Sequence, residues 1–343
     1  MNMEHERMTR GETEPISSPR ATLLESLNIQ KPIIQGGMGN ISPVELCVAV
    51  TQAGGLGQIG AGTLSVDELK QKIEMVQNHL QPNASFGVNI PLNVHPQLQD
   101  VIQLVIEKQV PIVSLSAGNP KPFIAELKER GRKVMVVVAT VEQGKKAESC
   151  GADVVIGEGF EAAGKNSPKE LTTLALIPQL TKALQIPVVA AGGIADGQGL
   201  LAAFAMGAAG VQLGTRLVMT KEATLHERYK DAILNASDED TIVLGRSYGF
   251  VTRLLHTPYA KSLLQREKQG IRIEDLLSAL DEKSHRLGAQ DGELDQGHVN
   301  AGQISGFIDS IPSVRELFED MELVARRRLE EIRSDFYQWE DKL

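Results

Sequence analysis

The sequence is poor in cysteine, and this scarcity excludes one way of holding a fold together. Only two cysteines occur among the 343 residues, Cys47 and Cys150, and each lies in a segment with helical periodicity. A disulfide scaffold or a thiolate metal framework needs more cysteines at closer spacing. We therefore expect no metal site and no disulfide framework, and a reducing cytoplasm as the working compartment.

Aromatic residues, basic charge and long apolar runs are also scarce. Aromatics make up 4% of the chain and apolar residues 42%, so the core must rest on Val, Ile, Leu and Ala. The net charge of −9 and a pI near 5.4 argue against a nucleic-acid partner. No apolar run reaches the about 18 residues of a membrane span, and segment 1–20 lacks an apolar signal core. We interpret 1–20 as a flexible tail without a functional role.

Short apolar runs that end in glycine recur along the chain, and helical segments lie between them. Apolar residues at three- and four-residue spacings predict helices over 66–80, 97–109 and 168–185, the last opening at Ser167-Pro168. Strands that alternate with helices form a parallel sheet. The eight predicted strands are 32–35, 56–59, 86–90, 112–116, 133–138, 153–157, 187–191 and 210–213.

Eight repeats indicate a closed (β/α)8 TIM barrel, which takes roughly 250 residues, rather than an open doubly wound sheet. The open sheet would show Gly-x-Gly-x-x-Gly after its first strand and an acidic residue near the end of its second. Gly36-Gly37-Met38-Gly39 lacks that spacing, and Gln58 stands where the acid would be. We therefore predict an α/β barrel.

The pattern changes after the eighth strand. Segment 218–298 is polar, helical and irregular, and it predicts a small helical substrate-side lobe inserted over the barrel mouth. The barrel would then comprise 21–217 and 299–343, with a helix of small residues opening at Ala301. The charged helix over 313–343 contains Arg326-Arg327-Arg328. We interpret that helix as a solvated face or an oligomer contact, so a homodimer is a hypothesis.

The ends of the last two strands carry the marks of a phosphate cradle. One strand ends in Gly192-Gly193, and the other runs through Gln212 and Leu213 into Gly214-Thr215. Paired glycines let backbone N–H groups approach an anion, and the next helix turns its positive end toward it. In eight-stranded barrels, a phosphate usually binds at these two loops.

The other strand ends are rich in small and amide residues. The first ends in Gly36-Gly37-Met38, the third in Asn89 and the fourth in Ser116-Ala117-Gly118, whereas carboxylates are few. Such residues do not suit a divalent metal. They favour a large, neutral, planar cofactor with a phosphate tail, and flavin mononucleotide (FMN) fits best.

At these same positions the chain resembles the nitronate monooxygenase (2-nitropropane dioxygenase) family of flavin barrels, which includes the enoyl-acyl-carrier-protein reductase II branch. The resemblance runs from about Ile29 to Phe307. The motifs that carry it are Pro32-Ile33-Ile34-Gln35-Gly36-Gly37-Met38, Ala53-Gly54-Gly55-Leu56-Gly57, Phe86-Gly87-Val88-Asn89, Ser116-Ala117-Gly118-Asn119-Pro120, Ala191-Gly192-Gly193-Ile194-Ala195-Asp196-Gly197, Gln212-Leu213-Gly214-Thr215-Arg216, Gly245-Arg246-Ser247 and Ala301-Gly302-Gln303.

The resemblance implies FMN in the barrel mouth. Its ring would lie against the first strand's glycines, and its phosphate would lie at the last two strands. At position 158, where this chain has glutamate, the family more often has glutamine. The implied cofactor-binding residues are Gly36, Gly37, Met38, Asn89, Glu158, Ala163, Gly164, Gly192, Gly193, Gln212, Leu213, Gly214 and Thr215.

One departure from the family concerns the catalytic residue. The family's histidine closes an Ala-Gly-Gly-His sequence, and here the stretch reads Ala162-Ala163-Gly164-Lys165. In the monooxygenases this histidine is assigned as the base that deprotonates a neutral nitroalkane. Lysine is charged at neutral pH and does not replace that base simply. As a cation, Lys165 could hold an anionic nitronate or a developing enolate oxygen.

Other histidines are candidates for the missing base. His95 lies just past the third strand, on the catalytic side of the barrel, so it is a second catalytic candidate beside the interpretation as an exposed loop residue. We interpret His226 and His298 as structural or exposed residues.

Three functions fit these observations. The first is an FMN-dependent nitronate monooxygenase that oxidises alkyl nitronates with O2. The second is an enoyl-acyl-carrier-protein reductase with FMN and NAD(P)H as electron donor. The third is a flavin-binding homologue that has lost activity with its histidine. In each case the expected partner is a small molecule.

Overall fold

The computed structural model describes residues 18–340, with side chains as far as residue 336. The predicted tail 1–20 lies outside the described residues, apart from its last three. Of these, Pro19 and Arg20 open the first helix, α1 (Pro19–Leu27), which Ser18 caps. Within the described part of the chain, no helix combines the length and apolar character that crossing a membrane demands.

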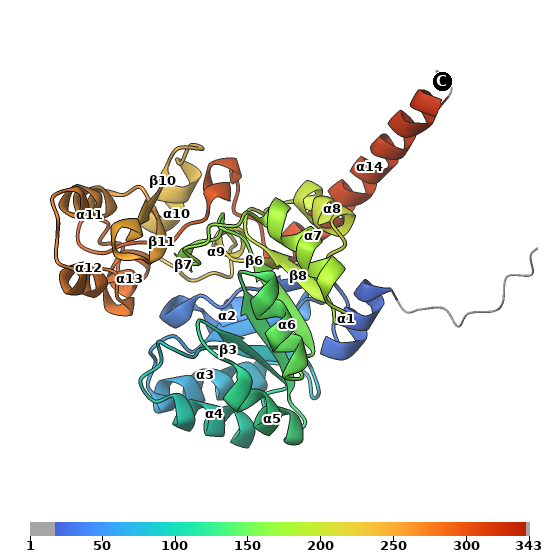
Figure 1. The fold of residues 1–343 in the computed structure, drawn as a ribbon, viewed down its shortest axis with the longest axis horizontal. Coiled ribbons are helices and arrows are strands. Elements are labelled where there is room, and N and C mark those ends of the chain that lie inside the picture. The colour runs from blue at the N-terminus through green and yellow to red at the C-terminus, as the bar shows by residue number, and fades with distance from the viewer. Residues whose placement is uncertain (1–17, 341–343) are drawn as a thin grey trace, which may run out of the picture.

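Eight parallel strands form the barrel, in the spatial order β1-β9-β8-β6-β5-β4-β3-β2 (Figure 1). A parallel bridge between Ile34 and Leu56 joins the first strand to the second and closes the ring. All eight predicted strands are confirmed within one residue at each end. They are β1 (Ile33–Gln35), β2 (Gly57–Gly60), β3 (Phe86–Pro91), β4 (Ile112–Ser116), β5 (Lys133–Val138), β6 (Val154–Glu158), β8 (Val188–Ala191) and β9 (Gly210–Leu213).

Helices between the strands cover the outside of the barrel (Figure 1). The predicted helix 66–80 is α3, which begins at a capping box formed by Ser65 and Glu68. The barrel helices are α2 (Val44–Gln52), α3 (Val66–His79), α4 (Leu98–Glu107), α5 (Lys121–Glu129), α6 (Val141–Ser149), α7 (Thr173–Ala183), α8 (Gly197–Ala205) and the short α9 (Thr215–Val218). Their apolar faces and the strands form the main core.

Two predicted helix starts are wrong. Helix α7 begins at Thr173 and not at Ser167-Pro168, because the Glu161 carboxylate accepts the hydrogen bond of the Thr173 amide and fixes the helix start there. The segment after Ala301 forms only a 3-10 turn, η3 (Gln303–Phe307). Two hydrogen bonds hold the start of this turn against the barrel. The backbone N–H of Gly302 donates to Thr215 Oγ1, and the backbone N–H of Gln303 donates to the Glu161 carbonyl.

The segment after β9 forms a lobe beside the barrel, as the sequence predicts, but the lobe also contains a sheet that the sequence did not predict (Figure 1). Strand β11 is central in it and pairs antiparallel with β10 and β7. Strand β7 (Gly164–Asn166) comes from the loop after β6, outside the predicted lobe. Because β7 belongs to this sheet but precedes residue 218, the sheet does not coincide with the predicted segment. The lobe boundaries 218 and 298 remain a prediction. The other lobe elements are α10 (Glu227–Leu234), β10 (Thr241–Leu244), η2 (Arg246–Tyr248), β11 (Val251–Leu255), α11 (Pro258–Lys268), α12 (Ile273–Ala279) and α13 (Glu282–Ala289).

The last helix, α14 (Val314–Glu340), returns to the barrel and then projects beyond it (Figure 1). Its first half packs against α8, closely enough that a Cβ on Gly197 would lie 2.3 Å from the Met321 carbonyl oxygen. Phe318 is fully buried beside Gly55 at the start of the second barrel repeat. The first half of α14 is therefore part of the barrel's packing.

Replacing Phe318 with alanine should lower the free energy of unfolding by about 3–5 kcal/mol, because it leaves a cavity between α14 and the barrel. Leu323→Ala is the matched control on the same helix. Its side chain is 65% exposed, so the expected change is within about 0.5 kcal/mol. Urea unfolding followed by circular dichroism measures both variants. Equal losses in the two would contradict this packing.

Candidate active site

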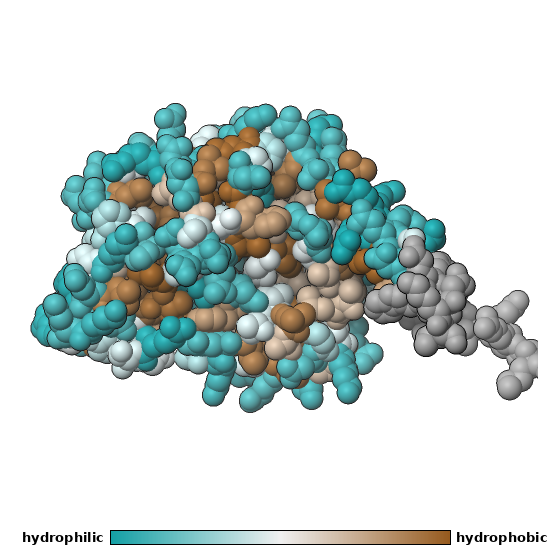
Figure 2. Space-filling view, turned by 90° about the horizontal axis from the view of Figure 1, so that it is seen from above, coloured by the Kyte–Doolittle hydropathy of each residue, from teal (hydrophilic) through white to brown (hydrophobic). Residues whose placement is uncertain are grey.

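A cavity of about 680 Å3 lies at the carboxyl ends of the barrel strands and is closed on one side by the lobe. Ligand pockets commonly have about 300–1,000 Å3. Residues after β1, β3, β4, β5, β6, β8 and β9 line it, together with Glu282, His285, His298 and Asn300 from the lobe side. The surface seen in Figure 2 is hydrophilic along much of its edge, with apolar patches between the polar side chains.

The ends of β8 and β9, where the sequence predicts a phosphate cradle, form one wall of the cavity. Gly192 and Gly193 have φ of +101° and +71°, which other residues rarely adopt, and both line the cavity. Gly214 also lines it, and a Cβ built there meets no protein atom within 4 Å. Asp196 already caps α8 by accepting from the Gly199 amide. The groups free to meet an anion are therefore the loop amides and the first turn after Gly214.

Gln212 and Leu213 precede this wall in β9, but only Gln212 lines the cavity. Gln212 lines the cavity, and its buried Oε1 has no hydrogen-bond partner among the described residues. Leu213 is buried behind the wall and is not a lining residue, although its carbonyl accepts a hydrogen bond from the Gly36 amide over 2.8 Å. Leu213 thus supports the wall from within the barrel.

The opposite wall comes from β1 and β3. Gly36, Gly37, Met38 and Asn89 all line the cavity. A Cβ on Gly37 would come within 2.4 Å of the Asn89 side chain, so only glycine lets the two loops approach this closely. The Asn89 amide donates to Ser116 Oγ over 3.2 Å, which fixes its orientation. The fold thus brings these four residues to one cavity, and their binding of a cofactor remains a prediction.

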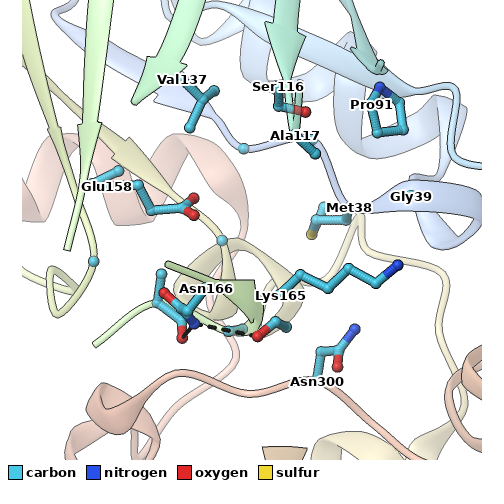
Figure 3. A pocket seen from close by; sticks show the side chains of 18 of the residues that line it. Met38, Gly39, Pro91, Ser116, Ala117, Val137, Glu158, Lys165, Asn166 and Asn300 are labelled. Atoms are coloured by element: carbon cyan, nitrogen blue, oxygen red, sulfur yellow. Dashed lines mark hydrogen bonds between the residues drawn. The ribbon is translucent and has the colours of Figure 1, made fainter. Parts of the chain in front are cut away.

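Glu158 ends β6 and points into the cavity (Figure 3). It is half-buried, and burial raises the pKa of its carboxyl to about 7. Where the family more often has an amide, this chain thus has a carboxyl that can change its protonation state near neutral pH.

Lys165 extends across the cavity between Met38 and Asn300 (Figure 3). It lies in β7, where it pairs with Thr252 of the lobe strand β11, and Ala163 and Gly164 line the cavity just before it. Its side chain is exposed, and within residues 18–336 its ammonium forms neither a hydrogen bond nor an ion pair. The cation is therefore free to meet a ligand.

His95 does not line the cavity, in contrast to its candidacy from the sequence. The ring is buried. Its Nε2 is 3.0 Å from the Leu64 carbonyl oxygen, and its Nδ1 accepts a hydrogen bond from the backbone N–H of Gln97 over 3.0 Å. Burial also lowers the pKa of His95. Since both ring nitrogens are used by backbone groups, we assign the residue a structural role. His226 likewise caps α10.

The lobe contributes residues that sequence reasoning missed. His285 and His298 are buried, line the cavity and stack with ring centroids 5.1 Å apart. Burial lowers the pKa of His298 to about 4 and that of His285 well below its ordinary value. Both rings are therefore neutral near pH 7, and the predicted exposed alternative for His298 is wrong. The polar pattern of 218–298 carries no periodic signal that would place them here.

Glu282 joins the lobe to the barrel at the same place. Its carboxylate accepts a hydrogen bond from the backbone N–H of Asn40 over 3.2 Å. Burial raises the pKa of Glu282, and the Asn40 hydrogen bond and the nearby Lys165 ammonium act in the opposite direction. Among residues 18–336, no group of three or more His, Cys, Asp or Glu side chains is arranged to hold a metal ion.

Comparison with known proteins places this architecture among named relatives. A family model described as nitronate monooxygenase matches residues 20–103 and 86–323. The structure of FabK from Thermotoga maritima superposes with a TM-score of 0.86 and 39% identity, covering 91% of this chain and 98% of that one. The family resemblance inferred from the motifs is thereby confirmed.

Two curated relatives show the range of activities assigned to such chains. A "(3aS,4S,5R,7aS)-5-hydroxy-7a-methyl-1-oxo-octahydro-1H-indene-4-carboxyl-CoA dehydrogenase" of Mycobacterium tuberculosis is 30% identical over 91% of this chain and 97% of its own length. A "Probable nitronate monooxygenase" of Staphylococcus saprophyticus is 38% identical over 63% of this chain and 73% of its own.

The raised pKa of Glu158 predicts a pH-dependent stability difference between the parent and Glu158→Gln. Below about pH 4.5 the carboxyl is protonated in both states. Between its ordinary value of 4.5 and about 7 the unfolded state ionises first, so the parent loses stability relative to the variant. Above pH 7 the difference stays constant, at up to about 3 kcal/mol.

Urea unfolding of the cofactor-free proteins from pH 4 to 8 measures this difference. Glu142→Gln, an exposed position on α6, is the control and should follow the parent at every pH. A Glu158→Gln difference that does not change with pH would contradict a raised pKa of this half-buried carboxyl.

Proposed function

This chain belongs to the nitronate monooxygenase family, and from that premise we propose that it is an FMN-dependent oxidoreductase that oxidises alkyl nitronates. The observation that carries the proposal is the Lys165 ammonium, which lines the cavity at the family's histidine position and has no hydrogen-bond or ion-pair partner among residues 18–336. A nitronate is already an anion and needs no base. A fixed cation is suited to bind it.

The residues present fit FMN. Gln212 Oε1 is a buried acceptor that still lacks a donor, and the flavin ring system carries N–H groups. Gly36, Gly37, Met38 and Asn89 would hold the ring, with Ala163 and Gly164 beside it. Gly192, Gly193, Gly214 and Thr215 would hold the phosphate, where the space beside Gly214 is open. When bound, FMN supplies the acceptor for two electrons from the substrate.

The chain's own groups would act on the substrate from two sides. Lys165 would bind the nitronate oxygens and orient the anion in the cavity. Glu158 faces the cavity from β6 and can hold or release a proton at its carboxyl near neutral pH. The buried His285 and His298 rings stay neutral, so they add no second positive charge. We also propose the cytoplasm as the working compartment, consistent with Cys47 and Cys150 as free thiols.

A second candidate is reduction of an enoyl thioester with electrons from NAD(P)H. The near full-length similarity to a carboxyl-CoA dehydrogenase favours a thioester substrate. In that reaction Lys165 would stabilise the developing enolate oxygen, so the same cation serves both chemistries. A flavin-binding homologue without turnover is the third alternative. Lys165→His would then create activity that the parent lacks.

Gly214→Ala should weaken FMN binding at least about tenfold and leave the cofactor-free protein stable. The added methyl meets no protein atom but projects toward the proposed phosphate site, where it would displace a hydrogen-bonded oxygen. Flavin fluorescence quenching measures the affinity. Riboflavin, which lacks the phosphate, is the control ligand and should bind both proteins equally. A parent that does not prefer FMN over riboflavin would exclude a phosphate at this wall.

Lys165→Met should raise KM for propyl-2-nitronate about 10–100-fold, because a charge-assisted contact contributes about 1.5–3 kcal/mol. Lys165→Arg keeps the charge and should retain most of the activity. Lys169→Met is the control, since Lys169 is exposed in the same loop but does not line the cavity. Oxygen consumption at varied substrate gives the constants. If neutral 2-nitropropane and its nitronate turn over at similar rates in the parent, Lys165 is not acting as an anion holder.

A further inference from the structure

Buried polar atoms without a partner gather at the cavity. Within the described part of the chain, six buried side-chain atoms lack a hydrogen-bond partner, and three of them belong to residues that line the cavity. One is Gln212 Oε1 at the end of β9, and the other two are His285 Nε2 and Asn300 Oδ1 on the lobe side. A buried polar group without a partner destabilises a fold. Two such groups beside one cavity therefore point to a ligand that completes them.

These two side chains contact each other. The Asn300 Nδ2 group donates a hydrogen bond to His285 Nδ1 over 3.4 Å. An amide nitrogen only donates, so His285 Nδ1 is the acceptor. Burial keeps the pKa of His285 well below its ordinary value, so the ring is neutral near pH 7 and has a single N–H. That N–H is on Nε2. The pair thus has one unused donor, His285 Nε2–H, and one unused acceptor, Asn300 Oδ1.

Neighbouring contacts hold the pair in place. The hydroxyl of the buried Tyr229 donates to the Asn300 carbonyl over 2.6 Å. The His298 ring stacks on His285, and its Nδ1 is 3.2 Å from Ser284 Oγ. Neither hydrogen bond uses the free donor or the free acceptor. Both groups are therefore preorganised for a ligand, which lowers the entropic cost of binding it.

The pair lies next to Lys165. A Cβ built on Gly164, the residue before Lys165, would be 3.5 Å from Asn300 Nδ2. Figure 3 shows Asn300 beside the Lys165 side chain. Burial lowers the pKa of His298 most, and the Lys165 ammonium acts in the same direction, so the ammonium is within electrostatic range of the stacked rings. A substrate held by Lys165 would thus have the pair beside it.

We propose that His285 and Asn300 form a substrate subsite for a neutral group that both donates and accepts a hydrogen bond, namely a hydroxyl or a carboxamide. The inference rests on the proposed function in that Lys165 holds the anionic end of the same substrate. Such a group can accept from His285 Nε2–H and donate to Asn300 Oδ1. An ionised carboxylate has no hydrogen to donate, and a plain alkyl chain leaves both groups unpaired. The preferred nitronate therefore carries a hydroxyl or a carboxamide.

Binding of unreactive ligands tests the subsite without turnover. Carboxylates are planar anions that can stand in for a nitronate, and each polar ligand has a methyl counterpart of similar shape. The hydroxyl pairs are 3-hydroxypropanoate with butanoate, 4-hydroxybutanoate with pentanoate, and 5-hydroxypentanoate with hexanoate. The carboxamide pair is 4-amino-4-oxobutanoate with 4-methylpentanoate. Titration calorimetry of the FMN-loaded protein should show at least about tenfold tighter binding of the polar ligand in at least one pair, because its counterpart leaves two buried groups unpaired.

Variants assign that preference to the pair. Asn300→Leu and His285→Phe should each bring the affinity ratio down to about one, because each removes a hydrogen-bonding group and keeps a similar volume. Asn119→Leu is the matched control, since Asn119 lines the same cavity from the loop after β4, and it should keep the parent's ratio. Lys165→Met should weaken both ligands of a pair equally and leave their ratio unchanged. This variant separates the subsite from the group that holds the anion.

Unchanged thermal unfolding and FMN affinity in Asn300→Leu and His285→Phe would show that the fold is intact and that the cofactor does not occupy the subsite. Three results would overturn the proposal. They are a parent without preference in any pair, a preference that survives both substitutions, and a loss of FMN affinity in both variants. A parent that shows the preference but does not oxidise nitronates would refute the proposed reaction and support the subsite.

Discussion

Closure of the parallel sheet is the constraint on which the site depends. The bridge between Ile34 and Leu56 joins β1 to β2 and leaves the barrel without a sheet edge. Since all eight strands run in the same direction, their carboxyl ends meet at one rim. The glycines after β1, β8 and β9 and the amide of Asn89 are far apart in sequence. They line one cavity because the ring closes.

The pairing of β7 with β11 brings the lobe and Lys165 to that rim. It fixes the loop after β6 against the lobe and carries Lys165 to the cavity. Glu282 fastens the lobe to the barrel through the Asn40 amide, close enough to Lys165 that the ammonium affects its pKa. The cavity therefore has backbone groups of the strand ends on the barrel side and the Lys165 ammonium on the lobe side. A phosphorylated planar cofactor and an anionic substrate fit these two sides.

Much of the barrel could be predicted from the sequence because its strands are buried on both faces and read as β-branched runs that end in glycine. The lobe's sheet could not, since Gly164-Lys165-Asn166 has no strand character of its own and becomes a strand only through β11. Two histidines were misplaced for a similar reason. His95 was a catalytic candidate but does not line the cavity, whereas His298 was interpreted as structural or exposed and does line it. Their distance along the chain from a strand end does not tell which side of a loop the ring occupies. Lys165 was identified through its position in the family motif.

The proposed reaction requires that a nitronate held by Lys165 transfers electrons to a flavin in this cavity. The most direct measurement is the absorbance of the FMN-loaded protein under anaerobic conditions, with propyl-2-nitronate and NADPH added in separate experiments. We predict that the nitronate alone bleaches the flavin band. Bleaching by NADPH and not by the nitronate would contradict nitronate oxidation and identify this chain as a reductase.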